Sequence, residues 1–330
     1  MASWYNLLEI TSKVGVFMYV FGIDVGGTSV KIGFLSSEGD LLESWSIPTD
    51  LRNHGDNILF DVAESIKKFM TMKSLKDSDI IGYGFGLPGP VLNDVAIKCP
   101  NLGWENVNVP EAFRSAYGKA VSVKAGNDAT VAAAGEYWQR NIKGDIVFIT
   151  LGTGVGGGIV ANGKVVDGAH GAGGEIGHIR VNFDHPTACS CGLEGCLETE
   201  CSIRGINRMA KVLIQSKMYK TTLTDDESLS PKQIFQAAKD GDAVGLKVAD
   251  QVGYYLGLAC AGIAVTTDPK VILIGGGISN AGDILLENIK KHYFKFAHFA
   301  VRNMQFELAN LGNDAGMYGA AYLVISESLS

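Results

Sequence analysis

The sequence has no block of lysines and arginines. Its 28 basic residues are outnumbered by 35 acidic residues, which gives a net charge of -7. A protein that binds nucleic acid through electrostatics needs a basic face, so this charge argues against a nucleic-acid partner. A small anionic ligand is still compatible with the composition.

Long apolar runs are missing as well. Gly, Asp or Lys interrupts each hydrophobic stretch before it reaches the roughly 18 residues that a membrane span needs. Glu9 and Lys13 break the apolar N-terminus and no basic segment precedes it, so we expect neither a signal peptide nor a membrane partner. The sequence predicts a cytoplasmic protein in which residues 1–17 are a leader or tag-like segment of unknown role.

Cysteines are few and unevenly spread. Four of the six lie between positions 189 and 201, and only Cys99 and Cys260 lie elsewhere. Disulfide frameworks spread through short secreted chains, whereas clustered thiols in a long chain without a signal peptide are more often metal ligands. The cluster therefore indicates a metal site, and Cys99, Cys201 and Cys260 are interpreted as buried or partly buried thiols without a nucleophilic role.

Glycine, by contrast, is abundant, with 42 residues in short clusters. Three clusters follow apolar runs: DVGGT at 24–28, LGTGVGGG at 151–158 and IGGGIS at 274–279. Any one of them could be a plain turn, but three together indicate a cleft in which backbone N–H groups surround a polyphosphate. None fits the Walker pattern or the GxGxxG fingerprint, which disfavours P-loop and Rossmann folds.

The apolar spacing predicts strands and helices in two domains. Residues 19–35 and 145–166 both read as strand, glycine turn and returning strand, which suggests two related halves. We expect a smaller α/β domain of residues 18–126 plus 312–330, and a larger α/β domain of residues 127–311 that carries the metal loop and a dimer surface. Residues 243–265 predict a long buried helix. A shorter helix is expected before it, with Ser230 as its N-cap.

Two aspartates stand where apolar strands end. Asp24 precedes Gly26 and is placed to meet Mg²⁺ directly or through water, although a turn cap is the ordinary alternative. Asp128 follows Asn127 at a strand-to-helix junction, where a helix cap is the ordinary role. Phosphoryl transfer to a hydroxyl needs a carboxylate that takes the proton, and Asp128 is the candidate for that base.

The strongest local signal is a cluster of His178, Cys189, Cys191 and Cys196. Three cysteines and one histidine satisfy a tetrahedral Zn²⁺, and four protein ligands make it structural, because a catalytic zinc keeps one position open. A set with Cys201 in place of His178 is the rival, and unligated thiols are a third interpretation. Folding around the metal would also fix nearby Glu175 and Glu198, which suits contacts to sugar hydroxyls.

Eight motifs occur in order: GIDVGGTSVKIG, LPGPV, NLGW, NDA, LGTGVGGGIV, GEIGHI, CSCGLEGCLE and IGGGIS. In this order they resemble the ROK family of sugar kinases, most closely its bacterial glucokinases, over about residues 20 to 325. The resemblance implies an α/β ATPase fold of the actin-like or hexokinase-like (ribonuclease H-like) class, with two lobes, an interlobe cleft and a homodimer.

Carried over by position, the family's catalytic base falls on Asp128. Its sugar contacts fall on Asn101, Asn127, Asp128, Glu175, His178 and Glu198, its zinc on His178, Cys189, Cys191 and Cys196, and its ATP contacts on Gly26, Gly27, Thr28, Thr153, Gly154, Gly276 and Gly277. His178 would bind zinc through one ring nitrogen and present the other to the sugar. Ser29 departs from the family, in which Lys often follows GGT.

The resemblance implies phosphorylation of glucose to glucose 6-phosphate, a step of glycolysis, with ATP, Mg²⁺ and a structural Zn²⁺. The alternatives are a kinase for N-acetylmannosamine, fructose or allose, polyphosphate as a donor, and a non-catalytic sugar sensor. The family's repressors carry an added helix-turn-helix domain, and the first seventeen residues are too short to form one.

Overall fold

The computed structural model describes residues 18–328, so the expected leader at residues 1–17 lies outside the described part of the chain. The described residues form two compact units. Unit 1 contains residues 18–143, 159–173 and 313–328. Unit 2 contains residues 144–158 and 174–312.

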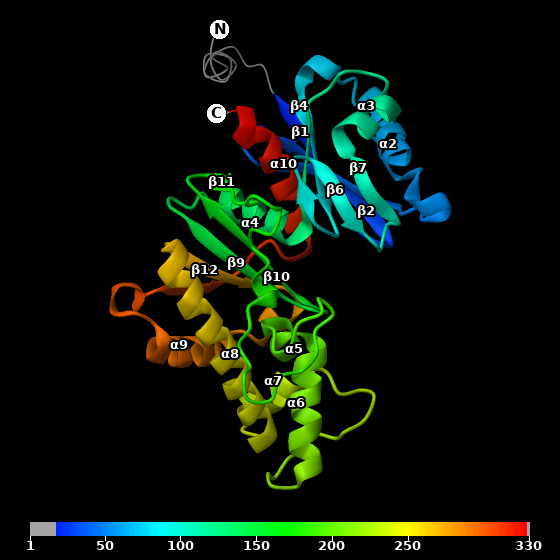
Figure 1. Cartoon of the computed structure of the whole chain (residues 1–330). Helices are drawn as coiled ribbons and strands as arrows, with labels where there is room; N and C mark the ends of the chain where they lie inside the picture. Colours follow the sequence, from blue (N-terminus) through cyan, green and yellow to red (C-terminus); the bar gives the residue numbers. More distant parts are fainter. Residues whose placement is uncertain (1–17, 329–330) are drawn as a thin grey trace. The chain divides into compact units, whose positions relative to one another are not determined.

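Unit 1 is built on a five-stranded sheet with the order β3-β2-β1-β4-β8 (Figure 1). The pairs β1–β2 and β2–β3 are antiparallel, while β1–β4 and β4–β8 are parallel, and a small antiparallel sheet β5-β6-β7 follows β4 in the chain. Its elements are β1 (Tyr19–Val25), β2 (Ser29–Ser36), β3 (Leu41–Pro48), α2 (Ile58–Met72), β4 (Ile80–Leu87), β5 (Val91–Leu92), β6 (Val95–Cys99), β7 (Trp104–Asn108), α3 (Val109–Tyr117), β8 (Val123–Asn127), α4 (Asp128–Gln139), β11 (Lys164–Val165) and α10 (Ala315–Ser328).

A second five-stranded sheet has the order β11-β10-β9-β12-β13. When the five strands of each sheet are numbered by their order in the chain, the spatial order in both sheets is third, second, first, fourth, fifth. This shared order is the repeat that the two strand–glycine–strand segments predicted. The remaining elements are β9 (Ile146–Leu151), β10 (Val155–Ala161), α5 (Leu197–Cys201), α6 (Ile203–Ser216), α7 (Pro231–Lys239), α8 (Ala243–Thr267), β12 (Val271–Gly275), α9 (Asp283–Phe296) and β13 (Gln305–Leu308). The assignment to unit 1 begins within β10, at Ile159.

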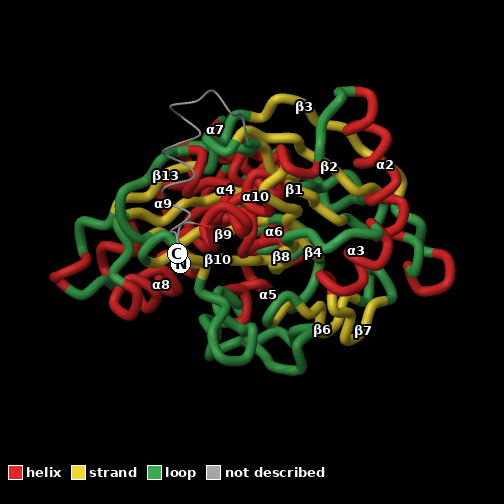
Figure 2. The backbone as a smooth tube through the Cα atoms, turned by 90° about the horizontal axis from the view of Figure 1, so that it is seen from above, coloured by secondary structure: helices red, strands yellow, loops and turns green. Residues whose placement is uncertain are grey.

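The two faces of the unit 1 sheet are covered by different helices. Phe21 and Ile23 of β1 pack into a core with α2 and α3, whereas Val20 packs with Ala321 and Val324 of α10. This alternation is the period-two pattern of a strand that is buried on both faces. Figures 1 and 2 both show α10 lying beside α4, and the rings of Trp138 and Tyr322 are 5.7 Å apart.

Close approach of α10 to the sheet depends on glycine. Gly22 and Gly84 are paired neighbours in β1 and β4, and a Cβ atom on either would overlap the backbone of α10. The C-terminal helix α10 thus packs on the sheet of unit 1. The division of the chain nevertheless differs from the expected boundary at residue 127, because α4 packs on α10 and so belongs to unit 1.

Helix α8 modifies one expectation from the sequence. Over residues 243–267 it is long and apolar enough to cross a membrane, although no stretch of that kind was expected. About 61% of its most apolar window is buried, and Gly253 and Gly257 lie against the backbone of α9 at Asn288 and Tyr293. The helix is therefore a core element of unit 2. Ser230 precedes α7 without capping it, since its hydroxyl donates to the side chain of Gln233 instead.

Candidate functional site

The first candidate is the junction of β8 and α4. Asn127, and not Asp128, is the N-cap: its Oδ1 accepts from the backbone N–H groups of Ala129 and Thr130. Asp128 lies exposed at the first helical position, and its Oδ1 accepts from the backbone N–H of Ala129 at 2.7 Å. The structure therefore presents Asp128 at a fixed point of the backbone with its side chain accessible.

A second contact of Asn127 reaches the LPGPV segment. Its Nδ2 donates to the carbonyl of Gly89 at 3.1 Å, which leaves one amide hydrogen for another acceptor. Cys99, which lies at the end of β6, is fully buried, and burial together with the charge of Asp128 raises the pKa of its thiol to about 11. Cys99 is therefore a protonated core thiol close to Asp128, in agreement with the expectation that it is no nucleophile.

Asn101 and the first glycine loop lie together in unit 1. Gly27 and Thr28 are exposed in the turn between β1 and β2, and the N–H of Gly26 donates to the carbonyl of Ser29. A Cβ atom on Gly27 would lie 3.8 Å from the Cβ of Asn101, which is itself exposed. The proposed sugar contact Asn101 and this turn therefore line the same surface of unit 1.

Asp24 is the last residue but one of β1 and lies on the face that α10 covers. A Cβ atom on Gly316, in the first turn of α10, would lie only 2.8 Å from its Oδ2. This burial raises the pKa of Asp24, and Lys31, its partner across the hairpin, partly opposes the rise. A desolvated carboxylate is costly unless a cation meets it, so the position suits the Mg²⁺ role expected from the sequence.

In unit 2, the four expected metal ligands converge. The ligand atoms of His178, Cys189, Cys191 and Cys196 all lie within 4.8 Å of one another. The Sγ atoms of Cys191 and Cys196 are 3.7 Å apart, and Nδ1 of His178 is 3.6 Å from Sγ of Cys189. A tetrahedral Zn²⁺ with Zn–S of about 2.3 Å and Zn–N of about 2.0 Å separates its ligand atoms by roughly 3.5–3.8 Å, so these donors fit zinc.

The rival ligand Cys201 is not part of this cluster. It is fully buried at the end of α5, its thiol points to the carbonyl of Val252, and burial raises its pKa well above the ordinary value. A protonated thiol is a poor zinc donor, because zinc binds the thiolate. Among the described residues, the set with His178 is therefore the one that the structure assembles.

Two carboxylates lie next to the cluster. Nε2 of His178, the ring nitrogen that faces away from Cys189, lies 3.8 Å from Oε2 of Glu175. Oε1 of Glu198 lies 4.0 Å from Sγ of Cys189, and its Oε2 accepts from the N–H of Val155 at 3.1 Å. Each carboxylate thus lies beside one ligand of the cluster, Glu175 beside His178 and Glu198 beside Cys189.

The two glycine loops of unit 2 also meet. Gly276 has a positive φ of 81°, and a Cβ atom there would overlap the backbone of Leu151, which precedes the Thr153–Gly154 turn. A cavity of about 320 Å³ opens beside Gly277, between Ile278 and helix α7. Its lining consists of Pro231, Lys232, Phe235, Gln236, Lys239, Gly277, Ile278, Asn280 and Ala281. The sequence pointed to Gly276 and Gly277 but not to α7, whose only local signal was its Ser-Pro start.

The expected site residues fall into two groups, one in each unit. Unit 1 carries Asp24, Gly26, Gly27, Thr28, Asn101, Asn127 and Asp128, and unit 2 carries Thr153, Gly154, Glu175, His178, Cys189, Cys191, Cys196, Glu198, Gly276 and Gly277. Within each unit the structure brings members of the set into contact.

Comparison with known proteins gives consistent results. The model of the ROK family matches residues 20–327. The chain is 40% identical over 311 residues to a glucokinase of Halalkalibacterium halodurans, and the match covers 92% of this chain and 94% of that protein.

Solved structures show the same likeness. A ROK family glucokinase from Streptomyces griseus in complex with glucose and AMPPNP has a TM-score of 0.70 and 28% identity, and the match covers 92% of this chain and 98% of that one. A ROK family transcriptional regulator, a homolog of the E. coli MLC protein, has a TM-score of 0.81 and 26% identity, with 98% and 84% covered. The expected actin-like α/β ATPase fold class is confirmed, and because kinases and a regulator share it, the site residues must decide the function.

Proposed function

Because the chain belongs to the ROK family, we propose that it is a sugar kinase that transfers the γ-phosphoryl group of ATP to the 6-hydroxyl group of glucose. One observation carries the proposal most directly: Asp128 stands exposed at the first turn of α4, with Asn127 taking the capping role. An exposed carboxylate at a fixed point of the backbone is what a general base for a sugar hydroxyl requires.

In the proposed reaction, the carboxylate of Asp128 accepts the proton of the sugar hydroxyl. The hydroxyl oxygen forms a bond to the γ-phosphorus, the bond from the γ-phosphorus to the β–γ bridging oxygen breaks, and ADP leaves. Sugar contacts are proposed for Asn101, Asn127 and Asp128 of unit 1. In unit 2 they are proposed for Glu175, His178 and Glu198.

The polyphosphate of ATP is proposed to lie against backbone N–H groups of the glycine loops at Gly26, Gly27, Thr28, Thr153, Gly154, Gly276 and Gly277. The cavity beside Gly277 supports this, because its wall of Phe235, Ile278 and Ala281 offers apolar surface for a nucleoside base. Asp24 would hold Mg²⁺, which neutralises phosphate charge when bound. The desolvation of Asp24, which Lys31 offsets only in part, supports that role.

Zinc is proposed as a structural metal held by His178, Cys189, Cys191 and Cys196. Bound there, it would supply a rigid tie and no open coordination position. Nδ1 of His178 faces the thiols and Nε2 faces Glu175. The ring can therefore support the position of Glu175, a carboxylate that is proposed to contact the sugar.

A cytoplasmic homodimer completes the proposal. In unit 2, Val212 of α6 and Tyr254 of α8 are 61% and 39% exposed beside a cavity of about 560 Å³. Exposed apolar side chains of this kind suit a second copy of the chain. Light scattering of the purified protein tests the mass directly.

A coupled ADP-release assay across a hexose panel tests the activity. We expect turnover with glucose above that with N-acetylmannosamine, fructose and allose, because a site that pairs several hydroxyls rejects epimers that leave its polar groups unpaired. A preference for one of the other hexoses would keep the kinase but replace the substrate. No turnover with any sugar and any of ATP or polyphosphate would favour the sugar sensor.

A further inference from the structure

Strand β8, which leads to the proposed catalytic residue Asp128, is an edge strand of the unit 1 sheet. It is the last strand of the order β3-β2-β1-β4-β8, so one side of its backbone has no neighbouring strand in that sheet. The N–H of Ala125 points to this side and donates to Oδ1 of Asp94 at 2.8 Å. A side chain thus supplies the acceptor that a further strand would supply, two residues before the cap Asn127.

Asp94 reaches this position from a tight hairpin. Leu92 and Val95 pair across the turn between β5 and β6, and the two central residues, Asn93 and Asp94, have φ values of 52° and 63°. A two-residue hairpin of this kind requires positive φ at both central positions and favours Asn-Gly. Glycine is the residue that fits position 94 best, so the aspartate is there at a conformational cost, which points to a role for its carboxylate.

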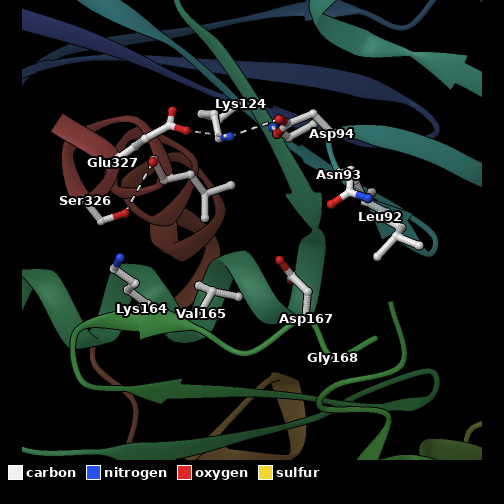
Figure 3. A pocket seen from close by; sticks show the side chains of 13 residues that line it. Leu92, Asn93, Asp94, Lys124, Lys164, Val165, Asp167, Gly168, Ser326 and Glu327 are labelled. Carbon is white, nitrogen blue, oxygen red and sulfur yellow. Dashed lines mark hydrogen bonds and ion pairs between the residues drawn. The ribbon is translucent and has the colours of Figure 1, made fainter. Parts of the chain in front are cut away.

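The carboxylate of Asp94 makes a second contact. Its Oδ2 lies 3.0 Å from Nζ of Lys124 in β8, and the same ammonium group lies 3.1 Å from Oε1 of Glu327 in α10. Figure 3 shows Lys124 between the two carboxylates at the wall of a cavity of about 500 Å³. Burial alone would lower the pKa of Lys124, but the bonds to Asp94 and Glu327 outweigh it and raise the pKa, so the ammonium stays charged.

The same loop is anchored to β8 a second time. Gly89, which precedes β5, accepts from Nδ2 of Asn127 at 3.1 Å. The segment 89–94 therefore contacts β8 at Lys124, Ala125 and Asn127, while the other edge of the strand is bonded to β4. With both edges held, the backbone that delivers Asp128 has little freedom to shift.

We propose that Asp94 is a positioning residue for phosphoryl transfer: through the N–H of Ala125 it fixes the last residues of β8, and so the direction in which Asp128 presents its carboxylate. Asp94 itself does not touch the substrates. The inference rests on the proposed role of Asp128 as the base. Because a misplacement of about 1 Å can cost about 100-fold in rate, such a residue acts on kcat.

The test uses Asp94→Gly, which suits the turn conformation and removes the carboxylate together with its bonds to Ala125 and Lys124. We expect kcat to fall about 10- to 100-fold, KM for glucose and ATP to stay within about threefold, and thermal stability to stay at that of the wild type. Asn93→Gly is the matched control, since it makes the same change at the neighbouring positive-φ position, and it should keep wild-type kcat. Asp94→Asn keeps an acceptor for Ala125 and should recover kcat to within about threefold of the wild type.

Deuterium uptake gives a readout that needs no activity. In Asp94→Gly, peptides spanning residues 123–130 should exchange faster than in the wild type and in Asn93→Gly. Wild-type kcat or unchanged uptake in Asp94→Gly would overturn the proposal, as would an Asp94→Asn variant as slow as Asp94→Gly. Asp128→Asn is measured alongside: if it stays active, the proposed base is wrong, and if it is inactive while Asp94→Gly is fast, only the positioning role falls.

Discussion

The carboxylate of Glu198 accepts a hydrogen bond from the backbone N–H of Val155, with 3.1 Å between Oε2 and N. Val155 begins the strand that follows the Thr153–Gly154 turn, and Glu198 follows the thiol Cys196 by two residues. A Cβ atom on Gly154 would overlap this carboxylate. The bond joins a proposed sugar contact, a proposed ATP loop and the metal cluster in one framework within unit 2.

Replacing Glu198 separates these functions. Glu198→Gln keeps an acceptor for Val155 but loses the charge, so KM for glucose should rise about 10-fold or more with KM for ATP within about threefold. Glu198→Ala removes the acceptor and should raise both constants. Steady-state kinetics with each substrate varied in turn measures the difference. An alanine variant with wild-type KM for ATP would show that the tie has no bearing on the loop.

Asp128→Asn should lower kcat by at least about 100-fold, because the amide keeps the shape of the side chain but cannot accept the proton. Glucose affinity, measured by calorimetry, should stay within about tenfold, since the amide can still bond a hydroxyl. Near-normal turnover would remove Asp128 as the base.

One zinc per chain is expected by elemental analysis. Cys191→Ser should lose the metal and destabilise the fold, because a bound structural metal adds its binding free energy to folding. Cys201→Ala is the control: it removes a buried thiol outside the cluster and should keep full zinc. Loss of zinc from the control with retention in Cys191→Ser would reverse the ligand assignment. A zinc-free but fully active wild-type protein would show that zinc does not position the sugar-binding residues.

Asp24→Asn should make the protein more stable and less active. Burial raises the pKa of Asp24 in the folded state, so the ionised form costs stability at neutral pH. The cost disappears below the ordinary carboxyl pKa of about 4, where both states are protonated. The melting temperature of the variant should therefore exceed that of the wild type at pH 7 and match it near pH 3.5, while kcat falls about 100-fold. A variant less stable at pH 7, or one with normal kcat, contradicts this account.

Gly277→Ala and Gly276→Ala form a matched pair. A Cβ atom on Gly277 meets no atom within 4 Å and would project into open space beside the cavity, so the fold should tolerate it while KM for ATP rises about 10-fold. Gly276 has positive φ and lies against the backbone of Leu151, so its alanine variant should lose stability. Thermal melts and ATP kinetics of both variants test these expectations. A Gly277→Ala variant with wild-type KM for ATP would show that the nucleotide does not bind beside Gly277.

Much of the local structure followed from the sequence. Ile58, Val62, Ile66 and Phe69 recur at helical spacing and form the buried face of α2. The two strand–glycine–strand segments that the sequence indicated belong to the two related sheets. The metal cluster was also predictable, because close ligand spacing along the chain leaves few ways to arrange the four side chains.

Contacts between distant segments were not predictable. Helix α4 looked like the start of the second domain, yet its packing on α10 places it in unit 1, nearly 190 residues from that partner in the chain. The pairing of Asp94 with Ala125 and the place of α7 beside Gly277 also depend on how separate elements dock. No periodicity or motif encodes such contacts.

By itself the sequence determined the chemical groups and their local setting: glycine turns at strand ends, an aspartate at a helix start and four metal donors in one short span. These follow from rules that act over a few residues, such as strand alternation, capping and ligand spacing. Only the tertiary structure decided that α10 desolvates Asp24 and that Asp94 closes the open edge of β8. Each of these depends on which surface covers a polar group, and burial arises only when remote segments pack together.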